Sequence, residues 1–590
     1  MRSRALPLLL TGALLVARGA AVQPNVILVM TDDQGYGDLS CHGNPILKTP
    51  HIDLLHSQSV RMTDYHVSPT CAPTRGALLT GRYSNRIGVW HTINGRSILR
   101  EGEVVIAEPF AKAGYATAMF GKWHLGDNFP SRAEDHGFQE VLRHGGGGVG
   151  QTPDFWDNAY FDGTYIHNGK PEPAKGFCTD VFFDAAMAFI RTQAKAKKPF
   201  LVYLATNAPH GPMHAPEEFA APYAGLGKHV ANFFGMIANI DANMGRLMRL
   251  VDAEGLANET ILIFTTDNGT SSGNRVFNAG MRGMKGSEYE GGHRVPFFIR
   301  WPGGNIGGGR DVSQLAAHVD VFPTLLQLCG IPAPAKVTFD GASVAPLLRG
   351  GEGGPAPGRI LITDSQRVHT PIKWKQSSVM SGHWRLINGQ ALYDIRSDPG
   401  QQKDIAAENA VMVERLKAAY ELQWAGLQPT FANAQPIVLG NDADNPCRLT
   451  CHDWLLKDAE GNAPWNQASI RAMRDAPVGE WHVRTDRPGR YRITLRRWPG
   501  EINIPIAADL PPGSPVPGEK AFRCTAGKGF PATRARIDIL DQIREQDVPA
   551  NASAVTFELP LETHEGTLRA IFTDATGKTL GAYYVEVQRL

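Results

Sequence analysis

A cysteine and an arginine one helical turn apart are the residues here whose types and spacing first suggest chemistry. Cys71 and Arg75 lie in residues 68–82, which predict a short proline-stiffened loop that leads into a helix. Their spacing places both side chains on one side of that helix. A helix N-terminus offers free backbone N–H groups and a positive dipole end, which suit an anion. The alternative is a buried structural cysteine beside a solvent-facing arginine.

Oxygen-bearing side chains follow two apolar runs, residues 25–30 and 260–266, that predict buried parallel strands. The residues in question are Asp32, Asp33, Asp267 and Asn268. Open α/β sheets bind ligands at the carboxyl ends of their strands, and adjacent buried carboxylates need a positive charge between them. Hard oxygen ligands predict calcium or magnesium rather than zinc. The alternative for the first pair is a solvated turn.

Lysine and histidine side chains supply further candidates. Lys122 and His124 follow a strand-like run and lie two residues apart, so on an extended segment they face the same way. His210 follows a third apolar run, and Lys285 lies in a glycine-rich segment after Asp267. The alternative for the first two is an exposed lysine and a core histidine.

These segments resemble the signatures of the type I sulfatases, formylglycine-dependent and arylsulfatase-like members of the alkaline phosphatase superfamily. The matching runs are Cys71-Ala72-Pro73-Thr74-Arg75, Leu78-Leu79-Thr80-Gly81-Arg82, Gly121-Lys122-Trp123-His124 and residues 282–296, which fit R-G-x-K-x-x-x-x-E-G-G-x-R-V-P. The resemblance covers roughly residues 22–427, most of the chain.

The resemblance implies that Cys71 is oxidised after translation to formylglycine, whose hydrate is the nucleophile. It implies one calcium ion, with magnesium as the second candidate, held by Asp32, Asp33, Cys71 in its converted form, Asp267 and Asn268. Arg75 would hold the nucleophile and, with Lys122 and Lys285, spread the charge on the sulfuryl oxygens. His210 would protonate the leaving oxygen, and His124 would assist the release of sulfate. The side chains that would bind substrate are Lys122, His210 and Lys285.

Aromatic residues outside these runs are candidates for a substrate pocket. Trp90 and His91 follow the Cys71 helix closely, and we predict that they contact the substrate. A second aromatic group lies among polar residues and fits stacking on a sugar or packing under a loop equally well. Its members are Phe155, Trp156, Tyr160 and Phe161.

The predicted function is hydrolysis of a sulfuric ester, either an aryl sulfate or a carbohydrate sulfate. Export and an accessory domain favour the carbohydrate sulfate. The nearest alternative is a phosphonate monoester or phosphodiester hydrolase on the same scaffold. A second alternative is a phosphatase- or phosphomutase-like enzyme with a Ser or Thr nucleophile and two zinc ions. Cys71 and the small number of histidine ligands argue against it. A third is an inactive carbohydrate-binding protein, against which the complete set of site residues argues.

The predicted fold is an α/β, alkaline-phosphatase-like sandwich with a large, mostly parallel central sheet flanked by helices. A small antiparallel α+β subdomain and an appended β-sandwich-like domain follow it. Glycine- and proline-rich residues 349–358 mark a boundary. The predicted divisions are a signal peptide at 1–21, a catalytic domain at 22–358, a C-terminal subdomain at 359–428 and an accessory β-rich domain at 429–590.

Composition narrows the class of protein. The 590 residues are 42% hydrophobic and 20% charged with a net charge of +1, which is typical of a globular protein and gives no argument for a nucleic-acid partner. A basic start, a short apolar stretch and small residues up to Ala21 predict export to the periplasm or medium, with no stable membrane span. The expected partners are a sulfated small molecule or glycan and a formylglycine-generating enzyme. Export would permit disulfides, but no pairing scheme for the seven cysteines follows from the sequence.

Overall fold

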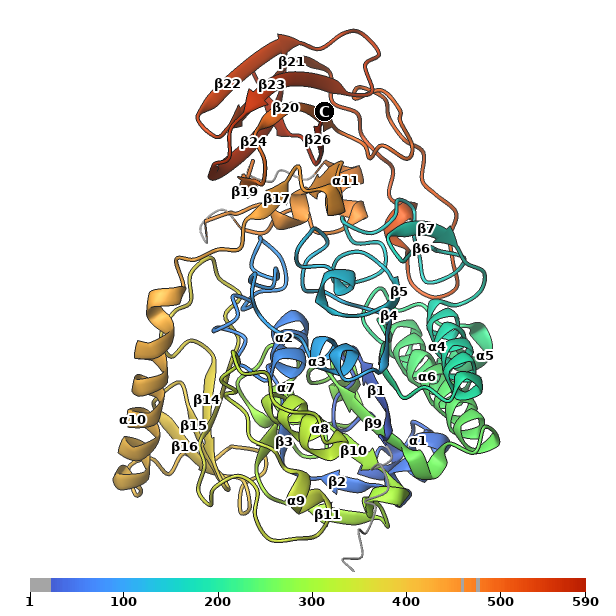
Figure 1. Cartoon of the computed structure of the whole chain (residues 1–590), viewed down its shortest axis with the longest axis vertical. Helices are drawn as coiled ribbons and strands as arrows, with labels where there is room; N and C mark the ends of the chain where they lie inside the picture. The colour runs from blue at the N-terminus through green and yellow to red at the C-terminus, as the bar shows by residue number, and fades with distance from the viewer. Residues whose placement is uncertain (1–22, 458–460, 474–477) are drawn as a thin grey trace, which may run out of the picture.

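The computed structural model describes residues 23–457, 461–473 and 478–590, so the predicted signal segment lies outside the described residues. Figure 1 shows a large body built on one sheet, a smaller sheet with the long helix α10 at its side, and a β-rich part at one end. This arrangement confirms the predicted fold class.

The central sheet has ten strands, with β1 next to its middle. β1 pairs in parallel with β8 on one side and β9 on the other, as buried, β-branched strands should. β10 and β6 run antiparallel to their neighbours near the two edges. In sheet order the strands are β11 (Arg310–Val312), β2 (Val60–Met62), β10 (Phe297–Arg300), β9 (Thr260–Thr266), β1 (Asn25–Thr31), β8 (Phe200–Ala205), β4 (Ala116–Gly121), β5 (Glu140–Arg143), β6 (Thr164–His167) and β7 (Lys170–Pro173).

Helices cover both faces of this sheet because alternate side chains of β1 enter two separate cores. Leu28 and Met30 pack on one face, and Ile27 and Val29 pack on the other. The first face is covered by α2 (Cys71–Thr80), α3 (Ala107–Lys112) and α8 (Val321–Cys329). The second is covered by α1 (Pro50–Gln58), α4 (Cys178–Ala196) and α6 (Lys228–Ala253).

The smaller sheet is antiparallel, with strands in sequence order, and lies within the predicted subdomain, residues 359–428. Tyr420 and Trp424 on the inner side of its helix pack with Leu386 and Leu392. The elements are β13 (Leu361–Asp364), β14 (Ser377–Ser381), β15 (Trp384–Ile387), β16 (Ala391–Asp394) and α10 (Ala410–Leu427).

The C-terminal part contains two sheets that share one core, as predicted for a β-sandwich-like domain. One sheet holds β17 (Ile437–Leu439), β19 (Trp481–Thr485), β24 (Glu565–Asp574), β21 (Ala532–Ile539), β22 (Gln542–Asp547) and β25 (Thr579–Gly581). The other holds β18 (Cys447–Thr450), β26 (Tyr584–Arg589), β20 (Gly489–Arg496) and β23 (Val555–Leu561). Trp156 of the large body joins this core, its ring 5.8 Å from that of Trp498. Of the two roles considered for Trp156, stacking on a sugar and packing, the structure supports packing.

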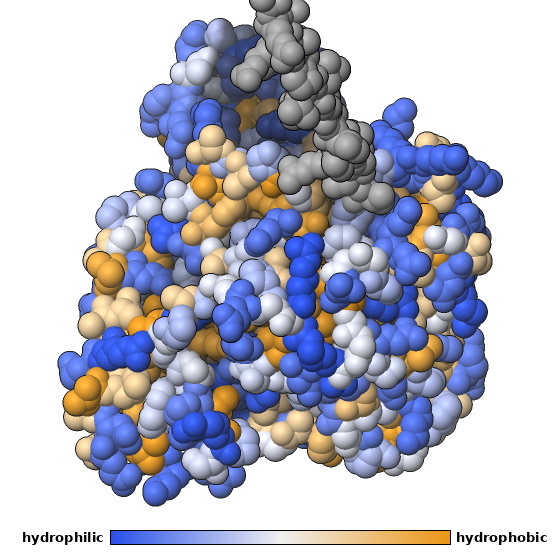
Figure 2. Space-filling view, turned by 60° about the horizontal axis from the view of Figure 1, so that its bottom comes forward, coloured by the Kyte–Doolittle hydropathy of each residue, from blue (hydrophilic) through white to orange (hydrophobic). Residues whose placement is uncertain are grey.

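The face of the molecule in Figure 2 has no unusual distribution of hydrophobic side chains, and the cysteines of the described residues form no disulfides. Hydrophobic residues are scattered among hydrophilic ones over the face seen in Figure 2, as on most protein surfaces. No helix of the described residues has the length and apolar character needed to cross a bilayer. All seven cysteines are free thiols.

Candidate active site

The predicted oxygen ligands meet at the carboxyl ends of two neighbouring strands. Thr31 of β1 pairs with Thr266 of β9, so the residues that follow each strand lie side by side. One carboxylate oxygen from each of Asp32, Asp33 and Asp267 lies within 4.8 Å of the other two. The Asn268 amide donates to Asp33 Oδ1 at 2.9 Å. All four side chains are buried, so the structure brings the predicted set together.

Two oxygens of this set lack hydrogen-bond partners among the described residues. They are Asp32 Oδ1 and Asn268 Oδ1, both shielded from solvent. An unpaired polar atom at such depth is costly unless a ligand or ion satisfies it. Burial, with Asp32 nearby, raises the pKa of Asp267 to about 6 although Arg75 opposes the shift. The donor set therefore fits a hard divalent cation such as calcium or magnesium.

Three cations surround these carboxylates. Lys122 Nζ lies 2.6 Å from Asp32 Oδ2, and Lys285 Nζ lies 2.5 Å from Asp33 Oδ1. Arg75 donates from Nη2 and Nε to Asp267 Oδ2 at 2.7 and 3.0 Å. Alternation of charge allows five buried ionisable groups and the half-buried Lys285 to lie together.

Cys71 is the first residue of α2 and lies at a pocket of about 460 Å³. His124, His210 and Lys285 line the same pocket. Arg75 and Lys122 do not line it, because both are fully buried among the carboxylates beneath. The start of α2, the two histidines and Lys285 thus share one pocket, and Lys285 connects that pocket to Asp33 of the carboxylate set.

The two histidines have defined orientations. His210 Nδ1 donates to the Gly211 carbonyl at 2.8 Å, which leaves Nε2 unprotonated and 4.0 Å from Asp33 Oδ2. His124 Nε2 donates to the Thr92 carbonyl at 2.8 Å, and its buried Nδ1 has no partner among the described residues. Burial lowers the pKa of His210 to about 3, with Lys285 adding to the shift, and burial also lowers the pKa of His124. Both imidazoles are therefore neutral and can accept a proton.

A glycine permits the close approach of the loop after β5 to one of these rings. A Cβ at Gly147 would lie 2.4 Å from Cε1 of His124. The backbone of this loop thus packs directly on the imidazole, which fixes the ring plane.

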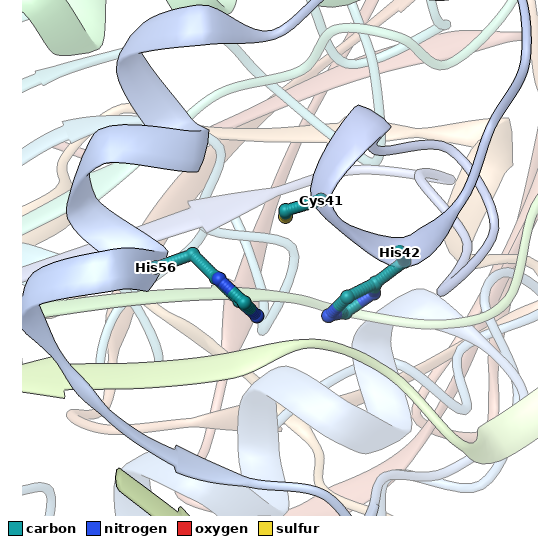
Figure 3. Close-up of side chains that lie close together, drawn as sticks. All are labelled: Cys41, His42 and His56. Carbon is teal, nitrogen blue, oxygen red and sulfur yellow. The ribbon is translucent and has the colours of Figure 1, made fainter. Parts of the chain in front are cut away.

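A group of softer metal ligands lies elsewhere. Figure 3 shows His42 and His56 facing each other with Cys41 beside them. None of the three lines the pocket. Arg61 Nη1 lies 3.4 Å from His56 Nδ1, and burial, reinforced by Asp53, raises the pKa of the Cys41 thiol. This group therefore gives no support to a zinc-based site around Cys71.

Comparison with known proteins settles the family. A family model described as Sulfatase matches residues 24–331. Human arylsulfatase A is 34% identical over 509 residues, which cover 76% of this chain and 96% of that protein. The chain belongs to the sulfatase family.

Other relatives agree with the assignment. The rat N-acetylgalactosamine-6-sulfatase is 30% identical to this sulfatase over 57% of the chain and 67% of that protein. The crystal structure of Ps i-CgsB in complex with k-i-k-neocarrahexaose superimposes with a TM-score of 0.63 at 26% identity, over 69% of this chain and 93% of that one. This sulfatase is accordingly an enzyme that hydrolyses sulfate esters.

One predicted substrate contact is wrong. Trp90 is 1% exposed, donates from its indole N–H to the Val368 carbonyl at 3.1 Å and packs edge-on against Phe431. It therefore packs against the C-terminal subdomain and does not reach the pocket. His91, by contrast, does line the pocket.

Sequence reasoning missed three pocket residues from later parts of this sulfatase. Arg367 comes from the small subdomain, and Asn462 and Trp465 come from the C-terminal part. Trp465 is only half-buried, unlike Trp454, Trp481 and Trp498 in the core of the same part. Its setting in a proline- and asparagine-containing loop was the one available signal.

Proposed function

We propose that this sulfatase removes sulfate from carbohydrate esters, using a hydrated formylglycine made from Cys71 and one calcium ion, with magnesium as the second candidate. One observation carries the proposal. Cys71 begins α2 in a pocket shared with His124, His210 and Lys285, and Lys285 pairs with a carboxylate of the oxygen set beneath.

The metal would be held by Asp32, Asp33, Asp267 and Asn268, with the group at position 71 as a further ligand. The two unpartnered oxygens, Asp32 Oδ1 and Asn268 Oδ1, support this assignment. When bound, the cation supplies positive charge that polarises a sulfuryl oxygen.

The chain's own residues then serve the transfer of the sulfuryl group. The nucleophile at position 71 attacks sulfur as the bond from sulfur to the leaving oxygen breaks. Lys285, already in the pocket, stabilises the negative charge that develops on the sulfuryl oxygens. His210 takes up a proton at Nε2 when the anionic ester binds, because the nearby negative charge favours the imidazolium, and it then gives this proton to the leaving oxygen. Its Nδ1–H bond to Gly211 leaves Nε2 available for this role.

Release of sulfate requires a base on the nucleophile's side. His124 Nδ1 is unprotonated and unpartnered, since its Nε2–H is committed to Thr92. It can take the proton from the second hydroxyl at position 71 as the aldehyde reforms and sulfate departs.

Export and maturation complete the proposal. The segment at 1–21 would direct the protein to the periplasm or medium, and a formylglycine-generating enzyme would convert Cys71. Sequencing the N-terminus of the protein recovered outside the cytoplasm tests whether the segment at 1–21 is a cleaved export signal. An intact residue 1 in that protein would contradict the proposal.

The deciding experiment uses protein produced with a formylglycine-generating enzyme. Mass spectrometry of the Cys71 peptide should show the aldehyde, and nitrophenyl sulfate should be hydrolysed. Activity with an intact thiol at position 71 would refute the mechanism. A higher kcat/KM for nitrophenyl phosphonate or phosphodiester substrates than for every sulfate ester would instead support the phosphonate hydrolase.

A further inference from the structure

One wall of the pocket comes from the C-terminal part of the chain. Trp465 and Asn462 lie in the loop before α11 (Gln467–Ala472), yet they line the same pocket as Cys71. Figure 1 shows the C-terminal sheets seated over the loops of the large body that follow α2 and β5. A domain that only decorated the enzyme would have no reason to place an indole at the catalytic pocket.

The position of this loop is fixed by the catalytic body. Thr152 donates from its backbone N to the Trp465 carbonyl at 2.9 Å and from its hydroxyl to the Pro464 carbonyl at 2.5 Å. Ala463 N donates to Asn94 Oδ1 at 3.0 Å. Both anchors are close in sequence to pocket residues, so the loop and the pocket form one unit.

The indole presents a partly open surface. Trp465 packs edge-on against Phe522, with ring centroids 6.0 Å apart and planes at 89°. A T-shaped contact occupies a single edge or face and leaves the rest of the ring available. An aromatic face beside polar groups is the surface on which sugar rings pack.

The other rim of the pocket is positively charged. Arg367 is exposed in the segment between β13 and β14 and lines the pocket with Lys285. None of the pocket's lining residues is aspartate or glutamate. Across the described residues, Arg367 is in no ion pair with a carboxylate. A guanidinium without a partner favours a planar or tetrahedral anion.

We propose that Trp465 and Arg367 form a glycan subsite in which a sugar ring stacks on the indole and a second anionic group of the substrate binds Arg367. The substrate class is then a sulfated oligosaccharide that carries another sulfate or a carboxylate near the ester that is cleaved. This inference rests on the proposed function and adds a role for the C-terminal part, which supplies the stacking surface.

The indole is tested with Trp465→Ala and Trp465→Phe in matured enzyme. Loss of an aromatic contact should raise KM for a disulfated disaccharide about tenfold in Trp465→Ala, and Trp465→Phe should restore most of the affinity. Inhibition by inorganic sulfate, measured with nitrophenyl sulfate as the reporter, should change less than about twofold because that ion fills only the cysteine end. Trp301→Ala, which removes another half-buried indole outside the pocket, is the matched control.

The guanidinium is tested with Arg367→Gln and Arg367→Lys. Arg367→Gln should weaken a disulfated disaccharide about tenfold and leave a monosulfated neutral disaccharide unchanged, as expected for one hydrogen-bonded ion pair. Arg367→Lys should keep part of the preference for the disulfated over the monosulfated disaccharide. Comparing a second sulfate with a uronate at the same sugar tells which anion the site takes. Arg396→Gln, an exposed arginine of the same subdomain outside the pocket, is the control.

The outcomes separate the subsite from the chemistry. If matured wild-type enzyme hydrolyses no sulfate ester, the proposed function fails. If it hydrolyses them, but Trp465→Ala weakens inorganic sulfate and disaccharide equally or leaves both unchanged, the stacking surface is refuted. If Arg367→Gln affects mono- and disulfated disaccharides alike, the second anion site is refuted.

Discussion

This enzyme contains two buried clusters of charged side chains, one in the active site and one that holds two parts of the structure together. One is the active-site set around Asp32, Asp33 and Asp267. The other lies where the small subdomain meets the large body, at Arg385 of β15. There Arg385 donates from Nε to Glu290 at 2.7 Å and from Nη2 to Asp64 at 2.6 Å.

The clusters differ in the direction in which the pKa of a central carboxyl group is shifted. Although burial favours the neutral acid, Arg385 lowers the pKa of Glu290 to about 2, so this carboxylate is stable as an anion. In the active site, burial and Asp32 raise the pKa of Asp267 to about 6, and Asp32 Oδ1 has no hydrogen-bond partner among the described residues. Glu290 Oε2 is likewise buried without a hydrogen-bond partner among the described residues, so burial, charge and an unpartnered oxygen do not by themselves distinguish an active site from a structural contact between subdomains. The raised pKa of Asp267 does.

The largest effect on turnover should follow removal of the group at position 71. Cys71→Ala should lower kcat on the order of 10⁴–10⁶-fold, as loss of a nucleophile does in other hydrolases. The melting temperature should stay within a few degrees, because the residue makes no ion pair in either cluster. Residual turnover above about 1% of wild type would show that another group attacks sulfur.

The next effect should come from His210 and depend on the leaving group. A sugar alkoxide needs a proton to depart, whereas nitrophenolate hardly does. His210→Ala should therefore slow a sulfated sugar about 10²–10⁴-fold and nitrophenyl sulfate much less. Equal losses in kcat on both substrates would mean that His210 only positions the sulfate.

Neutralising one active-site carboxylate should separate metal binding from folding. Asp267→Asn keeps an oxygen for Arg75 but removes a charged ligand, so calcium affinity should fall at least about 100-fold while the protein stays folded. In wild type, calcium must displace a proton from a group whose pKa is raised to about 6, so affinity should fall as pH drops below that value.

Calorimetric titration of chelator-treated protein measures both effects. Chelation should also abolish turnover, and calcium should restore it. Recovery with zinc but not with calcium or magnesium would overturn the oxygen-ligand assignment.

The smallest effect on turnover should come from the cluster around Arg385. Arg385→Met removes the guanidinium shared by two carboxylates, leaving Asp64 with His66 at 2.8 Å and Glu290 with Arg294 at 3.6 Å. The loss should cost about 3–5 kcal/mol of unfolding free energy, with kcat within about twofold below the melting transition. In wild type the ionised Glu290 contributes stability above pH ~4.3 that is lost as pH falls toward 2. Denaturant titrations across that range should show this acid limb in wild type and a smaller one in the variant. A loss of kcat in Arg385→Met without a loss of stability would show that this cluster serves catalysis and not only the structure.

Sequence patterns predicted the core of the fold and the floor of the site. Apolar β-branched runs identified β1 and β9, and the residues after them form the oxygen set because parallel neighbours end at one edge. The walls of the pocket were not predictable in the same way. Trp465 reaches it through hydrogen bonds to Thr152, more than three hundred residues earlier, and no local pattern encodes such a contact.

Periodicity also could not tell an inward-facing aromatic from a substrate contact. Trp90 and His91 are adjacent, yet one packs on Phe431 and the other faces the pocket. The choice depends on where the small subdomain docks, which is a property of the tertiary structure.

The depth of Cys71 has a consequence for how the active protein is made. Cys71 is 3% exposed and begins a helix whose ten residues are all buried. If Cys71 is converted as proposed, a modifying enzyme could reach the buried side chain only before α2 packs onto the sheet, so conversion would compete with folding of this helix. We infer that the fraction of active molecules depends on the rate of Cys71 conversion relative to the rate at which α2 packs onto the sheet. A variant that folds faster would therefore contain a smaller converted fraction.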